Sequence, residues 1–512
     1  MLFNSYSFLF CFLPLLVLAA HMGKRLGTQW PAGVLLVFSL VFYGLAGSGF
    51  LLMLIGLVAV NCWIGHQLAR PDGEIAQATR GRLDRKGALV LTLVLNLLPL
   101  VWFKYSGFLA QNLSLLLGTH LDIGSVGLPL GISFYTFIQI AWIMGVYQRK
   151  FQPPGLFRHV LFSSFFPYVI SGPIVRYEQM GPQFDAFEGP DADGMAKGLS
   201  LFSMGLAKKI IMADSLAVYA NYVFNAADGG LPLTGGEAWL GSLAYTFQLY
   251  FDFSGYTDMA LGLGLMLGLK LPENFDSPYK STGIVDFWRR WHITLGVWLR
   301  DFLYIPLGGN RAGKLKQYRN LFLTMFIGGI WHGAGWTFMI WGALHGLMLA
   351  INHYFRALIK GRPIETILRT LPFRCLFIFI TFLLINGCWV VFRATTLEGA
   401  MRIYGAMVAG GNTDPELVRT AAEGLTGWAA WVATYLPNGY FQGWTPFVLL
   451  GASLLICWFL PNSRQMFNPH PKETPTRFLW KPSTVWATCL ALLVFASLIL
   501  ASRKSTFLYF QF

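Results

Sequence analysis

Long runs of apolar residues constrain this chain more than any other feature, because a helix needs about 20 such residues to cross a bilayer. They recur from Phe8–Ala20 to Ala487–Leu500 along the 512 residues. Only 12% of the residues are charged, against about 25% in an ordinary soluble domain. The sequence therefore predicts an all-α integral membrane protein with about 11 to 13 transmembrane or re-entrant helices.

Basic residues lie in the short loops between the apolar runs. This placement explains the net charge of +14 as a topology signal rather than as a nucleic-acid surface. By the positive-inside rule, we expect residues 24–25 and 70–86 to face the cytoplasm. The other basic loops expected on that side are 149–158, 311–319, 356–374 and 464–481. The first apolar run has no basic segment before it and no small-residue cleavage site after it, so we expect it to stay as an anchor.

We expect one polytopic membrane domain, because no internal repeat is evident. Its expected parts are N-terminal helices in 1–120, a core in 121–350, C-terminal helices in 351–500 and an aromatic tail in 501–512. Pro129 and Gly131 interrupt an apolar run, which is typical of a broken or re-entrant helix shielded by protein. The six cysteines are scattered singly, and their spacing predicts no metal or redox site.

The segment Ile284–Phe302 fits one amphipathic helix. At 100° per residue, His292 falls on the apolar side with Trp288. The opposite side carries Asp286, Arg289, Arg290, Arg300 and Asp301. A single histidine on an apolar face is more often structural than functional, and the tryptophans around it favour function only modestly.

His332 lies in the string Trp331-His332-Gly333-Ala334, inside another apolar stretch. An ionisable group at membrane depth is costly and indicates function. An imidazole can take a proton from a hydroxyl near neutral pH. A catalytic base and a structural histidine bonded between helices both remain open. His345 is the weaker candidate, because on one continuous helix it would lie roughly opposite.

A polar stripe runs along the segment Ala244–Ala260. It consists of Tyr245, Gln248, Asp252 and Tyr256 at helical spacing. The stripe fits a tunnel wall and a hydrogen-bonded seam between helices equally well.

Two arginines follow turns. Arg176 directly follows the turn Ser171–Val175, and Arg311 directly follows the loop Tyr304–Asn310. Both segments are ordinary helix stops, but either arginine could contact a phosphate of a nucleotide-type donor.

The sequence ends in Phe507-Leu508-Tyr509-Phe510-Gln511-Phe512. Termini are commonly frayed and polar, so this aromatic tail is expected to be docked. An interfacial aromatic belt is the simple explanation, and a reactive hydroxyl on Tyr509 is the alternative.

Five strings carry a family resemblance through their order and spacing. They are FDFSGY (251–256), FWRRWH (287–292), WLRD (298–301), LGGNR (307–311) and WHGA (331–334). Together they resemble the membrane-bound O-acyltransferase family, in particular the bacterial branch that modifies alginate and teichoic acids. The likeness is dense from about residue 128 to 346.

The resemblance implies a ring of tilted helices around a tunnel that joins both membrane faces. It implies that His332 is catalytic and that His292 is the second family histidine. The expected tunnel lining is Tyr245, Gln248, Asp252, Tyr256, Trp288, Trp331 and Trp336. The expected donor-binding candidates are Arg176, Arg289, Arg290, Arg300 and Arg311. The tail also resembles the acyl-accepting tyrosine motif of a small partner in teichoic-acid D-alanylation, which makes Tyr509 an acyl-relay candidate.

The expected function is transfer of an acetyl group from a cytoplasmic thioester donor, with acetyl-CoA as the expected donor, for O-acetylation of an exported polysaccharide such as alginate. Expected partners are a periplasmic SGNH-type polysaccharide acetyltransferase, other exopolysaccharide secretion proteins and membrane lipid, with no nucleic acid. The expected location is the bacterial inner membrane, with no metal or prosthetic group. Alternatives are D-alanylation of teichoic acid, acetylation of cellulose or peptidoglycan, a lysophospholipid acceptor and, from another class, a transporter or flippase.

Overall fold

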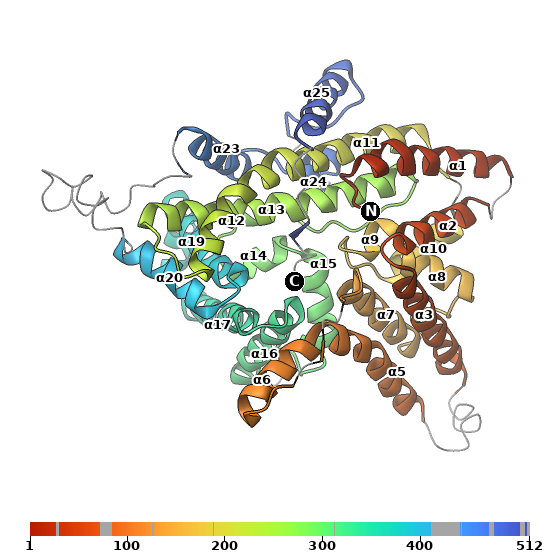
Figure 1. The fold of residues 1–512 in the computed structure, drawn as a ribbon, viewed down its shortest axis with the longest axis horizontal. Helices are drawn as coiled ribbons and strands as arrows, with labels where there is room; N and C mark the ends of the chain where they lie inside the picture. The colour runs from red at the N-terminus through yellow and green to blue at the C-terminus, as the bar shows by residue number, and fades with distance from the viewer. Residues whose placement is uncertain are drawn as a thin grey trace, which may run out of the picture. The chain divides into compact units, whose positions relative to one another are not determined.

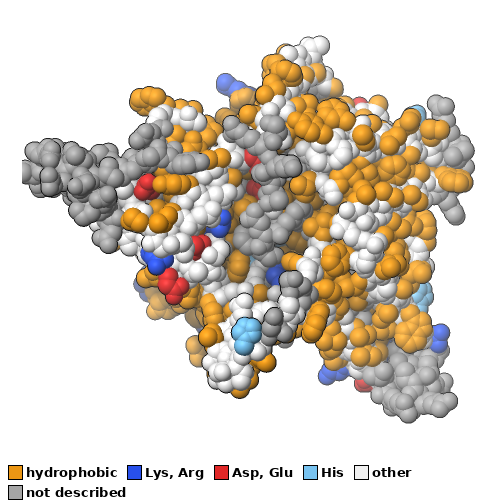
Figure 2. Space-filling view, in the orientation of Figure 1, with side chains coloured by type: hydrophobic (Ala, Val, Ile, Leu, Met, Phe, Trp, Pro, Cys, Tyr) orange, Lys and Arg blue, Asp and Glu red, His pale blue; other side chains and the backbone are white. Residues whose placement is uncertain are grey.

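The computed structural model is built from helices. It describes residues 1–26, 30–71, 84–121, 123–124, 127–187, 189–311, 313–410, 441, 443–470, 476–501 and 507–508. Over these ranges the chain contains no strand, which confirms the predicted all-α class. Figure 1 shows the helices, and Figure 2 shows hydrophobic side chains over much of the visible surface, with few charged ones. An apolar outer surface is what a protein solvated by lipid requires.

Three helical stretches in the described residues are long and apolar enough to cross a membrane. They are Ser48–Ala69, Arg85–Leu117 and Leu371–Arg393. Shorter apolar helices are Phe8–Gly23, Trp30–Gly44, Ile132–Tyr147, Thr445–Phe459 and Thr484–Leu500. The number of crossings therefore stays a prediction.

The chain forms two compact units. The first comprises Met1–Gly205, Tyr256–Glu273 and Lys481–Ala491, and the second comprises Leu206–Gly255, Asn274–Trp480 and Leu492–Phe512. Three described helices contribute to both units: α11 (Ala192–Ala207), α13 (Gly235–Met266) and α25 (Thr484–Leu500).

The first unit packs around aromatic rings. Its helical segments are η1 (Phe8–Phe12), α1 (Leu13–Leu26), α2 (Trp30–Gly44), α3 (Ser48–Ala69), α5 (Arg85–Leu100), η2 (Val101–Tyr105), α6 (Ser106–Leu117), α7 (Ile132–Tyr147), α8 (Leu156–Ser164), α9 (Phe166–Val169), α10 (Tyr177–Asp185) and most of α11 (Ala192–Ala207). Phe42 lies 5.7 Å from Phe3 and 5.3 Å from Phe166, centroid to centroid. The expected interruption at Pro129 and Gly131 is present, because α7 begins only after Gly131, whose φ is +73°.

The second unit carries the motifs singled out by the sequence. Its remaining helical segments are η3 (Lys208–Ala213), α12 (Asp214–Asp228), η4 (Pro278–Lys280), α14 (Ile284–Arg290), α15 (Ile293–Leu299), η5 (Arg300–Tyr304), α16 (Lys314–His332), α17 (Trp336–Ile359), α18 (Pro363–Leu368), α19 (Leu371–Arg393), α20 (Leu397–Ala409), α23 (Thr445–Phe459) and α24 (Ser463–Phe467). Helix α13 confirms the expected helix over 244–260.

Helices α16 and α17 form a hairpin that glycines hold close together. A Cβ on Gly329 would lie 2.9 Å from the Cα of Gly342, and one on Gly342 would lie 2.6 Å from the carbonyl oxygen of Met325. Only glycine lets two backbones approach this closely. The glycines before His332 therefore accommodate the neighbouring helix.

Candidate active site

The single helix predicted for Ile284–Phe302 is wrong. Helix α14 ends at Arg290 and α15 begins at Ile293. Between them, His292 adopts a left-handed conformation with φ +44° and ψ +54°, which side-chain-bearing residues rarely occupy. Periodicity does not reveal a one-residue kink, because the helical pattern continues on both sides of it.

Asn274 holds the His292 kink in place. Its Oδ1 accepts the backbone N–H of Thr294 at 3.2 Å and the Thr294 hydroxyl at 2.9 Å, and it lies 3.1 Å from His292 Nδ1. A backbone N–H can only donate, so the shared Asn274 atom is the oxygen and His292 Nδ1 must carry a proton. In the neutral ring, Nε2 then carries the lone pair.

His332 lies at the end of α16, among aromatic rings. Its centroid is 4.9 Å from Trp331, 5.0 Å from Trp341 and 5.3 Å from Phe392, and its side chain is buried. All three ring pairs meet edge to face or nearly so. The hairpin therefore places an ionisable ring in an apolar enclosure, the costly arrangement that indicates function.

His345 belongs to the same cluster, contrary to the expectation that it would lie opposite. The helix stops at His332 and restarts at Trp336, so the angle of one continuous helix does not apply. The His345 ring lies 4.5 Å from Trp341, which also contacts His332. The glycines at 333 and 335 were the sequence signal for the break. We call His332, Trp341, His345 and Trp288 the hairpin cluster.

Trp288 fixes the proton of His345. Its indole Nε1 lies 3.2 Å from His345 Nδ1, and an indole nitrogen can only donate. His345 Nδ1 therefore accepts, and the neutral ring carries its proton on Nε2. That Nε2 is buried, with no hydrogen-bond partner in the described part of the chain. His345 thus presents a donor, whereas the neutral His292 ring has its lone pair on Nε2.

Tryptophan rings connect the two histidine regions. Trp291, next to His292, lies 5.1 Å from Trp389, which lies 5.9 Å from Trp341 in the hairpin cluster. The predicted residues His292, His332 and Trp288 therefore share one ring network within the second unit. Trp331 is 6% exposed, whereas Trp336 is 56% exposed.

The polar stripe on α13 divides into parts with different surroundings. Asp252 forms a buried ion pair with Lys209 at 2.6 Å, and Lys209 also pairs with Asp214 at 2.7 Å. Here the stripe acts as a seam to a neighbouring segment. Tyr245 and Gln248 differ, because the Tyr245 hydroxyl and Gln248 Oε1 are buried without hydrogen-bond partners among the described residues.

Tyr256 lies in the first unit, where it stacks on Phe3 at 4.8 Å. The stripe's four members therefore do not share one environment, although they share one helix.

Residues 507–508 of the tail are docked on α13. The Leu508 N–H donates to Asp252 Oδ2 at 2.9 Å, and the Phe507 ring lies 6.2 Å from Phe253. Both tail residues are buried, as expected of a docked tail. Phe253 also meets His292 edge to face at 4.8 Å. Tyr509 lies outside the described residues.

The donor-binding arginine candidates are dispersed. Arg176 is the N-cap residue of α10 in the first unit. Arg289 and Arg311 are exposed, and exposed Arg300 pairs with Asp301 at 2.6 Å.

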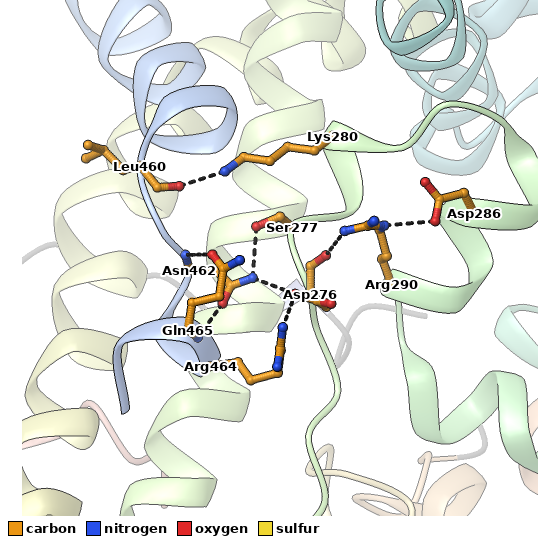
Figure 3. A network of polar contacts seen from close by, with 9 residues as sticks. All are labelled: Asp276, Ser277, Lys280, Asp286, Arg290, Leu460, Asn462, Arg464 and Gln465. Atoms are coloured by element: carbon orange, nitrogen blue, oxygen red, sulfur yellow. Dashed lines mark hydrogen bonds and ion pairs between the residues drawn. The ribbon is translucent and has the colours of Figure 1, made fainter. Parts of the chain in front are cut away.

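Arg290 belongs to a polar network. It donates to Asp286 at 2.9 Å and to the Asp276 carbonyl at 3.3 Å (Figure 3). Asn462 and Arg464 reach the Asp276 carboxylate from the other side, at 2.8 and 3.1 Å. This network ties residues 276–290 to the segment before and within α24.

The groups gathered in this region are imidazole and aromatic rings. No group of three or more His, Cys, Asp or Glu side chains that could hold a metal ion occurs over the described ranges. The distinctive residues are His292, His332 and His345, which lie among aromatic rings. Hydrogen bonds define which nitrogen carries the proton in the neutral rings of His292 and His345.

Comparisons with known proteins identify the family. Residues 87–391 match the membrane-bound O-acyltransferase family, MBOAT. The chain is 40% identical to the probable alginate O-acetylase AlgI of Pseudomonas putida over the whole of both proteins. It is 36% identical to the peptidoglycan O-acetyltransferase of Helicobacter pylori, over all of this chain and 98% of the relative. It is 33% identical to the teichoic acid D-alanyltransferase of Bacillus subtilis over 44% of this chain and 59% of the relative. The chain therefore belongs to the membrane-bound O-acyltransferase family, as a membrane protein and an acyltransferase.

Proposed function

We propose that the chain takes an acetyl group from a cytoplasmic thioester donor, most simply acetyl-CoA, and passes it across the bacterial inner membrane for O-acetylation of an exported polysaccharide. Alginate is the first candidate polymer, supported by 40% identity over full length to a probable alginate O-acetylase. Peptidoglycan is the second, supported by 36% identity over the whole chain to a peptidoglycan O-acetyltransferase. D-alanylation has less support, since that likeness covers 44% of the chain.

The observation that carries this proposal is His332 buried against Trp331, Trp341 and Phe392 at the break between α16 and α17. In the proposed reaction, His332 takes the proton of the attacking hydroxyl as its oxygen bonds to the thioester carbonyl carbon. The carbon–sulfur bond then breaks, and the leaving thiolate receives that proton. A thiolate leaves readily, so a covalent Ser or Cys intermediate is not required.

The other two histidines have different proposed roles. The N–H on His345 Nε2 suits a donor to the carbonyl oxygen as negative charge develops on it, because a buried donor stabilises an oxyanion strongly. His292, held by Asn274, suits orientation of the donor or acceptor. Tyr245 and Gln248, with buried polar atoms lacking partners in the described chain, suit contact with a polar substrate.

Tyr509 is the proposed first acceptor. Its hydroxyl would receive the acetyl group as an ester and hand it to a periplasmic SGNH-type acetyltransferase, which modifies the polymer. Support comes from Leu508, anchored to Asp252, and from Phe253, which contacts both Phe507 and His292. Mass analysis of the C-terminal peptide after supply of labelled acetyl-CoA tests this step. We expect a labelled ester that is absent in Tyr509→Phe; equal labelling of both forms contradicts the relay.

The polymer is tested in cells that lack the chain. We expect the O-acetyl content of alginate, measured by nuclear magnetic resonance, to fall to background and to return with the wild-type chain. The muropeptides of the same cells provide the matched measurement. Loss of peptidoglycan acetylation with unchanged alginate would contradict the first candidate and favour the second.

A further inference from the structure

A large cavity in the second unit is lined by none of the four residues of the hairpin cluster, and its lining is partly basic and partly apolar. Its volume is about 1030 Å³, and it is lined by parts of α14, α17, α18 and α19. Six lining side chains are Lys or Arg and two are Asp or Glu, so the lining carries a formal charge of +4. Much of the rest is aliphatic or aromatic.

Four of the six cations have no carboxylate partner among the described residues. Arg369 pairs with Glu365 at 2.6 Å, and Arg290 pairs with Asp286 at 2.9 Å. Of these four, Lys280 donates to the Leu460 carbonyl at 2.8 Å. By contrast, the side chains of exposed Arg356, Lys360 and Arg374 form no hydrogen bond or ion pair with the described residues. The Gly361 N–H, with help from Arg369, holds the pKa of Glu365 below its usual value, so this carboxylate stays ionised and paired.

The apolar lining extends away from these cations along two helices. On α17, Phe355, Ile351 and Met348 occupy successive turns of one face, and on α19 Phe377, Ile380 and Leu384 do the same. From Arg356 to Met348 the helix rises about 12 Å, and from Arg374 to Leu384 about 15 Å. Half of a bilayer's hydrocarbon core is also about 15 Å thick. The cavity therefore has the length of one leaflet, with a basic end.

Several of these apolar side chains face outward. Ile351 is 56% exposed, Leu384 is 52% exposed and Phe355 is 40% exposed. Helix α19 is itself long and apolar enough to cross a membrane, and the basic end falls in the loop predicted to be cytoplasmic. An outward-facing alkyl wall suits acyl chains, whereas the polar amide arm of a coenzyme would leave its amides without partners there.

We propose that this cavity binds an anionic phospholipid, with its phosphate between Arg356 and Arg374 and its acyl chains along α17 and α19. Basic pockets between transmembrane helices on the cytoplasmic side are suited to acidic headgroups. The proposed lipid site uses none of the histidines of the acetyl transfer, and the one donor-binding candidate in its lining, Arg290, is paired with Asp286.

The test uses purified full-length protein and measures retention of phosphatidylglycerol by native mass spectrometry. Phosphatidylcholine is the zwitterionic comparison, and acetyl-CoA is the other phosphate source. In Arg356→Gln/Arg374→Gln we expect phosphatidylglycerol affinity to fall about 25-fold, since each basic residue near an anionic lipid contributes about fivefold. The double variant Arg356→Lys/Arg374→Lys keeps both charges and should retain most of the affinity.

The matched control is Lys316→Gln/Arg362→Gln, which also removes two exposed cations but lies outside the cavity. It should bind phosphatidylglycerol like the wild type. Equal retention of both lipids, or equal loss in the control, would overturn the proposal. So would retention of acetyl-CoA at the cavity in place of the lipid, with the glutamine variants raising the KM for the donor alone. Monodisperse elution and an unchanged thermal midpoint show that each variant is folded.

Discussion

His292 and His332 are both buried in the second unit, yet their surroundings differ. Asn274 holds the His292 ring by a hydrogen bond at a left-handed backbone kink, which fixes which nitrogen carries the proton. His332 lies instead at the break of a helical hairpin, with three aromatic rings around it. A histidine ring that is held through both its backbone and its side chain, like that of His292, suits the orientation of a substrate. A ring at a break between helices, enclosed by apolar faces, suits proton transfer.

The largest effect should come from removing the imidazole of His332, which tests whether this histidine, unlike His292, transfers the proton. His332→Gln keeps a polar side chain but no suitable base, so we expect acetyl transfer to fall about 10²- to 10⁴-fold. The protein should reach the membrane at its normal level. His353→Gln, on the neighbouring helix α17 and half-buried, is the control and should stay near wild type. Comparable acetylation in both variants would remove His332 from the mechanism.

The second test concerns the charge that anchors the tail beside His292. Asp252→Ala leaves the buried Lys209 with Asp214 alone and removes the acceptor of the Leu508 N–H. We expect a loss of about 3 kcal/mol in the free energy of unfolding, as for other broken buried pairs. Asp252→Asn also loses the charge but keeps an acceptor. Hydrogen exchange at Leu508 should therefore rise far more in the alanine variant, and equal exchange in both would contradict a docked tail.

The third test concerns the oxygen that holds the His292 kink. Asn274→Ala leaves three donors without their acceptor, so we expect a loss of about 1 to 3 kcal/mol in unfolding free energy. Thr294→Val removes one of these bonds and should cost less. If His292 only orients a substrate, Asn274→Ala should change KM as well as kcat. An unchanged KM with a reduced kcat would assign His292 to the chemical step.

The smallest expected effect comes from Trp288. Trp288→Phe keeps an aromatic ring but removes the N–H that donates to His345, at a cost of about 1 kcal/mol. The proton of His345 is then free to move to Nδ1, so we expect kcat to fall by about fivefold with KM nearly unchanged. Comparing this variant with His345→Phe shows whether the tautomer matters. If the two variants behave alike while transfer stays normal, His345 has no role in the reaction.

The sequence predicted some of this arrangement well. Apolar runs and charge predicted the all-α membrane class, and helical spacing predicted the helix that carries Asp252. The strings around His292 and His332 resembled the family that the comparisons show. These features are local, so a pattern over a few helical turns is enough to reveal them.

Other parts depended on contacts that no local pattern contains. Asn274 lies 18 residues before His292, and Phe392 lies on a different helix from His332. The breaks at His292 and after His332 interrupt helices without interrupting their apolar periodicity. The spacing of a continuous helix therefore placed His345 opposite His332, whereas the break brings both histidines against Trp341. The partner of the tail, Asp252, was likewise visible only in three dimensions.

The most direct test of the central claim follows the acetyl group across sealed inside-out membrane vesicles. Labelled acetyl-CoA is supplied outside, at the former cytoplasmic face, with alginate and the periplasmic acetyltransferase enclosed. The account predicts labelled acetyl esters on the enclosed polymer with the wild-type chain and background label with His332→Gln at an equal protein level. Equal label in the two preparations, or none with the wild type, would contradict it.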